Sequence, residues 1–137
     1  MATTTRNPPT AFSLDRGRKA QGGRKKDAGH LAFVRKLPCL ITGRGGVEAA
    51  HVSYGDPAHD KPARGLGSKS DDKWAVPLSR RWHQGGKGSQ HSMNERKFWE
   101  GWGIDPCAVA VELYRVSGDV DAGVEVVREA RRKAGLE

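Results

Sequence analysis

The stretches Val47-Glu-Ala-Ala-His-Val52 and Trp74-Ala-Val-Pro-Leu-Ser-Arg-Arg-Trp-His83 decide the fold. The first is compact and apolar, follows two glycines, and predicts a strand that carries His51 near its end. Residues 53–73 form a long polar loop, and residues 74–78 predict a second strand. A helix is expected to start at Ser79. This order of strand, loop, strand and helix predicts a small α+β core.

Helices are expected on both sides of that core. Asp27 can cap a first helix that ends before Pro38, with an apolar stripe made of Leu31, Phe33, Val34 and Leu37. Ser92 to Glu95 has capping-box spacing and predicts a helix that buries Phe98, Trp99 and Trp102. Asp105-Pro106 predicts the start of another helix, over about 108–116. A final amphipathic helix is expected over about 121–133, with Val124, Val127 and Ala130 or Ala134 facing inward.

The charge of the chain favours a polyanionic partner. The 137 residues carry a formal net charge of +8, which indicates nucleic acid first and a membrane surface second. Much of the excess lies in residues 1–26, which hold seven Lys or Arg and one Asp. These residues predict a flexible basic arm that is either a solvated leader or a phosphate-binding segment. We therefore divide the chain into the arm 1–26, a domain 27–116 and a C-terminal helix 117–137.

The chain is expected to work inside a cell. No apolar run approaches the length of a membrane span, and the N-terminus lacks the apolar segment of a signal peptide. Cys39 and Cys107 are the two cysteines and lie in unlike contexts, which suits a reducing compartment. We expect Cys107 to be a small core residue.

Three histidines stand in a frame that suits phosphodiester chemistry. His51 lies on the first predicted strand, His83 on the helix after the second strand, and His91 beyond a glycine-rich insert. One imidazole could activate water while two others hold a cation beside a phosphate. His30 and His59 are expected to have no such role, although His59 or Asp56 could approach the cation.

This pattern resembles the HNH, or His-Me finger, endonucleases, and most closely the small phage and bacterial members of the recombination-enhancement type. The resemblance covers about residues 35–116 and is carried by the following positions: Pro38-Cys39, Glu48-Ala-Ala-His51, Lys69-Ser-Asp-Asp72, Val76-Pro-Leu78, His83, Gln90-His91, Glu95, Trp99 and Gly103-Ile-Asp-Pro106. It implies a ββα-metal core and metal-dependent cleavage of DNA. It also implies a place in the cytoplasm of a bacterial cell or a phage-infected host.

Carried over residue by residue, the resemblance makes His51 the general base and His83 and His91 ligands of one divalent ion. The ion would bind the scissile phosphate, and Mg, Mn, Zn or Ni all fit these ligands. Relatives often place a further ligand directly before the base, where this chain has Ala50. Trp74 falls near the usual asparagine, so another group, such as a backbone carbonyl, would have to orient His51.

The structural zinc site of many relatives is not expected in this chain. Its four cysteine positions correspond to Cys39, Thr42, Ser79 and Trp82. One thiolate with hydroxyls and an indole cannot form a closed tetrahedral site. We predict no structural zinc and expect Trp82, with neighbouring apolar groups, to fill its place.

Basic side chains in the loop after His51 and in the arm are candidates for contact with phosphates. They are Lys61, Arg64, Lys69 and Lys73 in the loop and Arg24, Lys25 and Lys26 in the arm. None resembles a base-reading helix, so we expect low sequence preference on DNA, with RNA as a possible substrate. The oligomeric state is left open.

Two other functions remain open from the sequence. The chain could be a nucleic-acid-binding or packaging factor that keeps the nuclease scaffold without activity. Alternatively, it could be an interaction protein whose C-terminal helix, from about Asp121, binds a partner. That helix could equally pack on its own domain.

Overall fold

The computed structural model describes residues 25–63, 70–90 and 94–137. In chain order the elements are α2 (Ala28–Val34), β1 (Val47–His51), the 3-10 turns η1 (Pro57–His59) and η2 (Asp72–Trp74), β2 (Ala75–Ser79), α3 (Arg80–Gln84), α4 (Glu95–Trp102), α5 (Pro106–Arg115) and α6 (Val120–Lys133). The chain is thus a small α+β protein, as predicted. Among the helices of the described segments, none combines the length and the apolar character that a membrane span requires.

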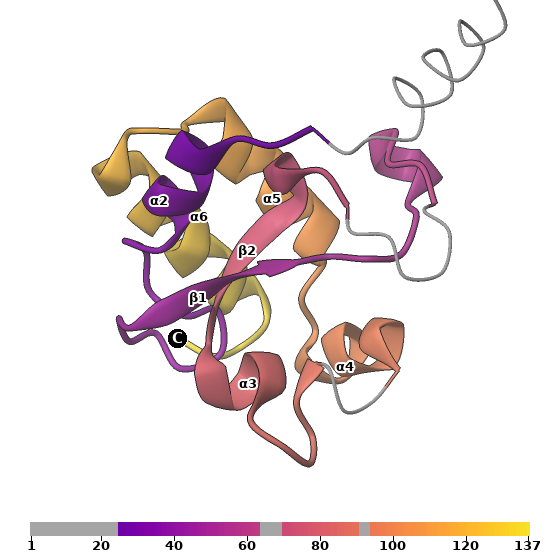
Figure 1. The fold of residues 1–137 in the computed structure, drawn as a ribbon. Helices are drawn as coiled ribbons and strands as arrows, with labels where there is room; N and C mark the ends of the chain where they lie inside the picture. Colours follow the sequence, from indigo (N-terminus) through magenta and orange to yellow (C-terminus); the bar gives the residue numbers. More distant parts are fainter. Residues whose placement is uncertain (1–24, 64–69, 91–93) are drawn as a thin grey trace, which may run out of the picture.

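The centre of the fold is an antiparallel pair of short strands (Figure 1). In the register, Val47 of β1 lies opposite Ser79, and His51 lies opposite Ala75 of β2. Helix α3 begins directly after β2, so the predicted order of strand, strand and helix is confirmed. His51 lies at the end of β1 and His83 lies on α3. The two strands and α3 therefore position His51 and His83, two of the three histidines.

Helices α2 and α5 pack on the strands, and α6 packs on α5 (Figure 1). Residues from all of these elements are fully buried, among them Val34, Ala50, Val76, Leu78, Leu113 and Val127. Helix α6 lies close to α2 because Gly123 has no side chain. A Cβ at this position would lie 2.7 Å from Cζ of Phe33. The C-terminal helix thus packs on its own domain.

Several boundaries differ from the sequence prediction. Helix α4 has Asn94 as its N-cap, whose side chain accepts the Lys97 N–H, whereas the predicted cap Ser92 lies outside the described residues. The predicted capping partner, Glu95, instead binds Ser53. Helix α6 starts at Val120, because the Asp119 carboxylate caps it.

The predicted aromatic core of α4 is confirmed for two of its three side chains. Phe98 and Trp99 are buried, and their rings meet edge to face. Trp102 is half-buried and packs edge to face on Trp82, with ring centroids 5.2 Å apart. Cys107 is buried as expected.

The long loop between the strands is more ordered in its described parts than the sequence predicts. It contains η1, η2 and an isolated bridge between Asp56 and Lys61. Trp74 ends η2 instead of beginning β2. The turn η1 forms because the Asp56 carboxylate caps it by accepting the N–H of Ala58.

His30 makes the stability of the protein sensitive to mild acid. The ring is 1% exposed and Nδ1 lies 2.8 Å from Oγ of Ser117. Burial lowers the pKa of His30 below its ordinary value of 6.5. In the unfolded chain the ring is protonated below about pH 6.5, whereas in the folded protein it stays neutral to lower pH, so stability should fall as pH falls through this range.

We expect His30→Leu to flatten the dependence of unfolding free energy on pH between about pH 5 and 7. The difference between wild type and variant isolates His30, because the other histidines are present in both. Urea unfolding at several pH values provides the measurement. Identical slopes for the two proteins would contradict the assignment.

Candidate functional site

His51 lies at the end of β1, and the buried carboxylate of Asp72 in η2 binds its ring. Its Nε2 lies 2.8 Å from Oδ1 of Asp72, and the side chains of His51 and Asp72 are 17% and 3% exposed. With an ionised Asp72, Nε2–H is the donor and Nδ1 carries the free lone pair. The site thus presents an imidazole that can accept a proton through Nδ1.

Asp72 is itself fixed by the chain that leads into α2. Its Oδ2 accepts the N–H of Asp27 at 2.7 Å, and its own N–H donates to the carbonyl of Lys25 at 3.0 Å. The neighbouring Asp71 accepts the Lys25 N–H at 2.7 Å. These bonds make η2 a rigid support for His51, and they attach residue 25 to the folded domain two residues earlier than predicted.

Sequence reasoning missed the role of Asp72. A backbone carbonyl was one expected partner for His51, whereas the structure places this carboxylate there. The available signal was the pair Asp71-Asp72 directly before a predicted strand. It could not be assigned, because only the antiparallel register brings the start of β2 beside the end of β1.

His83 forms a second pair with a carboxylate. Its Nδ1 lies 2.8 Å from Oε1 of Glu48, a residue of β1, and the same oxygen accepts from Nε2 of Gln84 at 2.9 Å. The hydrogen bond from His83 is the largest of the effects that lower the pKa of Glu48. Glu48 therefore fixes the orientation of the His83 ring, as carboxylates commonly do for histidines that bind a metal through their other nitrogen.

Gln90 ties the segment before His91 to the end of β1. The Gln90 side chain is 2% exposed, and Nε2 lies 2.9 Å from Oε2 of Glu95 and 3.5 Å from the carbonyl oxygen of His51. Glu95 also accepts the N–H of Ser53. His91, the third predicted site residue, lies outside the described residues, but its chain neighbour is anchored beside His51.

The predicted phosphate-binding residues differ in their exposure to solvent. Lys25, Lys26 and Lys73 are exposed, and Nζ of Lys73 lies 5.4 Å from the centre of the Trp74 ring. Arg24, Arg64 and Lys69 lie outside the described residues.

Lys61 differs from its expected place on the surface. It is 3% exposed, and its Nζ donates to the carbonyl of Tyr54 at 2.6 Å and to Oγ of Ser70 at 2.8 Å. The ammonium group is used to hold the two ends of the loop together. In this position Lys61 does not reach a phosphate.

Cys39, at one of the four positions where the resemblance would place zinc ligands, makes hydrogen bonds within the turn of residues 39–44. Sγ of Cys39 accepts the N–H groups of Ile41, Thr42 and Ser79 at 3.3, 3.5 and 3.3 Å. These bonds lower the pKa of the thiol against the opposing effect of its burial. These bonds hold the turn of residues 39–44 and join it to Ser79 of β2.

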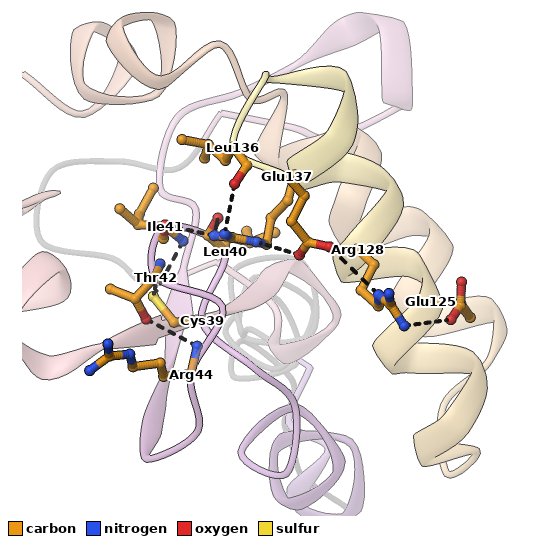
Figure 2. Close-up of polar contacts among 10 residues, drawn as sticks. Cys39, Leu40, Ile41, Thr42, Arg44, Glu125, Arg128, Leu136 and Glu137 are labelled. Carbon is orange, nitrogen blue, oxygen red and sulfur yellow. Dashed lines mark hydrogen bonds and ion pairs between the residues drawn. The ribbon is translucent and has the colours of Figure 1, made fainter.

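Arg131 of α6 also binds this turn, whose residues Leu40 and Ile41 are labelled in Figure 2. Its guanidinium donates to the carbonyls of Leu40 and Ile41 at 3.1 and 2.6 Å, and to the carboxylate of Glu137 at 2.8 Å. Arg131 is 7% exposed and packs beside Gly43, where a Cβ would lie 3.1 Å from Cζ. Helix α6 thus binds the turn of residues 39–44 through Arg131, a role that was not predicted from the sequence.

A third pair of histidine and carboxylate lies in the loop after β1. Nδ1 of His59 is 2.8 Å from Oδ2 of Asp56. This bond raises the pKa of His59 and lowers the pKa of Asp56. From the sequence, His59 was expected to have no role of its own, although His59 or Asp56 could approach the cation.

Comparisons of the chain with models of protein families, with curated proteins and with solved structures found no match. The chemistry of the described side chains therefore carries the functional argument.

Proposed function

We propose that this protein is a metal-dependent endonuclease of the His-Me finger type that hydrolyses DNA, with His51 as the general base. The observation that carries the proposal is the pair of His51 and buried Asp72 at the end of β1. A carboxylate that accepts from Nε2 keeps the proton on that nitrogen and favours the imidazolium that forms when Nδ1 accepts a second proton. This is the role required of a base that activates water.

In the proposed reaction, Nδ1 of His51 takes a proton from water as its oxygen attacks the phosphorus. The bond between phosphorus and the 3′ oxygen breaks, and that oxygen leaves with the electron pair. Asp72 is a positioning residue, because it stabilises the charged ring of His51 without touching the substrate. Gln90 binds the carbonyl of His51 and Glu95 binds the N–H of Ser53, so both hold the backbone directly after the base.

The donor set fits a divalent ion. Nε2 of His83 is directed by the bond between Nδ1 and Glu48, and His91 would supply a second imidazole. An ion held there would neutralise charge on the phosphate and on the leaving oxygen. Mg, Mn, Zn and Ni are all candidates, and neutral imidazole favours Zn and Ni over Mn and Mg.

The exposed lysines favour a polyanionic substrate. Lys25 and Lys26 belong to a segment whose backbone N–H groups bind the carboxylates of Asp71 and Asp72. Their side chains therefore begin close to Asp72, the residue that binds His51. Such contacts are made with phosphates and carry little sequence information. We therefore propose low sequence preference.

The proposal is tested with purified full-length protein, stripped of metal, and supercoiled plasmid. We expect nicked or linear product after addition of Mg, Mn, Zn or Ni, and none when EDTA is added first. Retarded but uncut plasmid at every metal tested would overturn the proposal in favour of a binding factor that keeps the scaffold.

Removal of Glu48 is expected to weaken metal binding at His83. Without the carboxylate the ring loses its fixed orientation, and loss of such a partner typically lowers affinity by about 10–100-fold. Glu48→Ala should therefore need a correspondingly higher metal concentration for half-maximal cleavage.

The matched control is Glu112→Ala, which removes an exposed glutamate whose partner is Arg115. It should leave the metal requirement of wild type. An unchanged metal titration for Glu48→Ala would show that Glu48 does not support a ligand.

A further inference from the structure

Three potential ligands from two distant segments meet beside η1. Asp56 and His59 belong to the loop after β1, and Asp105 precedes α5. One ligand atom from each lies within 4.8 Å of the others. Asp56 and His59 are half-buried, and Asp105 is exposed, so a cation can reach the group.

The loop that carries two of these ligands is fixed by its own backbone. Asp56 and Lys61 exchange two backbone hydrogen bonds of 2.9 and 3.0 Å, and the His59 N–H donates to the carbonyl of Asp56 at 3.0 Å. Asp60 closes the turn at a φ of 57°. The buried Nζ of Lys61 then binds Ser70 behind the loop. The carboxylate and the imidazole are therefore presented by a preformed turn.

The third ligand is fixed by α5. Oδ1 of Asp105 accepts the N–H groups of Cys107 and Ala108, both at 3.1 Å. The capping bonds use one carboxylate oxygen and determine where the other lies. Helix α5 also contacts η1 directly. This contact sets the separation between Asp105 and His59.

We propose that Asp56, His59 and Asp105 form a binding site for a divalent transition-metal ion, separate from His51 and His83. An imidazole and two carboxylates suit Zn or Mn. Two ligands bonded to one such ion lie at most about 4.2 Å apart, because each bond is about 2.1 Å long. The ligand atoms lie within 4.8 Å of one another without an ion, so binding requires only a small closure of the three side chains.

The site would connect the loop after His51 to α5. Three protein ligands leave at least one coordination position for water or another ligand. His59 and Asp105 also line a cavity of about 760 Å³ that α5 shares with α6. The proposal does not depend on nuclease activity.

The test measures zinc binding to the full chain in a His83→Gln background, which removes a ligand of the other proposed site. Equilibrium dialysis should give one equivalent of bound zinc for His83→Gln and none at the same free zinc for His83→Gln/His59→Gln. Zinc should also raise the unfolding temperature of the first protein and leave that of the second unchanged.

Asp105→Asn provides a second variant that preserves folding, because asparagine caps a helix as well as aspartate does. We expect zinc to bind at least about tenfold more weakly when this charged ligand is lost, since even the loss of a residue that supports a ligand typically costs about 10–100-fold. The matched control is Asp119→Asn, which makes the same change at the N-cap of α6, and it should bind zinc as the background does.

Two results would overturn the site. One is an equal amount of bound zinc, including none, in His83→Gln with and without His59→Gln. The other is equal zinc affinity for Asp105→Asn and Asp119→Asn. Both readouts are independent of DNA cleavage, so the failure of this site and the failure of the nuclease proposal are distinguishable.

Discussion

His51→Ala is expected to lower the rate of DNA cleavage by about 10²–10⁴-fold, the usual contribution of a positioned general base. The imidazole is the group whose Nδ1 is left to accept a proton after Asp72 has bound Nε2. Alanine retains the backbone contact of residue 51 with Gln90, so the local fold should persist. A plasmid nicking assay at saturating metal, with circular dichroism as a check of folding, measures the effect.

Added imidazole should restore part of the activity of His51→Ala, because a small base can enter the space left by the ring. Arg115→Ala, which removes an exposed side chain paired with Glu112, serves as a control with wild-type activity. Cleavage by His51→Ala at the wild-type rate would remove His51 from the mechanism.

Arg131→Met is expected to destabilise the protein by about 2–4 kcal/mol. The substitution leaves the carbonyls of Leu40 and Ile41 without the guanidinium that they bind. A buried carbonyl without a partner costs about 1–3 kcal/mol. Methionine keeps much of the apolar stem, so the loss reports mainly on these polar contacts. Urea unfolding of wild type and variant at one pH provides the measurement.

Arg128→Met is the matched control, since it changes the same residue type one turn earlier on α6. The Arg128 side chain is 51% exposed and pairs with Glu125 and Glu137 across 3.6 Å (Figure 2). Exposed ion pairs contribute about 0–1 kcal/mol. Equal losses for the two variants would show that the buried contacts of Arg131 add no special stability.

Cys39 and Arg131 together hold the turn of residues 39–44. The Cys39 thiol accepts the N–H groups of Ile41 and Ser79, while Arg131 donates to the carbonyls of Leu40 and Ile41. The turn is thus bonded to both β2 and α6.

The sequence by itself determined the elements of the fold. The order of the two strands and α3, the apolar face of α2, the proline-marked start of α5 and the buried Phe98 and Trp99 all follow from local patterns. Such patterns can be read because turn residues, caps and apolar spacing act over a few neighbouring residues. The same reasoning placed His51 at the end of a strand and His83 on a helix.

Only the tertiary structure decided which groups meet. Asp72 reaches His51 across 21 positions of the chain, Glu48 reaches His83 across 35, and Arg131 reaches Leu40 across 91. It also turned Lys61 from an expected surface contact into a buried anchor, and brought Asp105 beside His59. Contacts of this range depend on strand register and helix packing. These are set by the whole core and leave no periodic signal in the sequence.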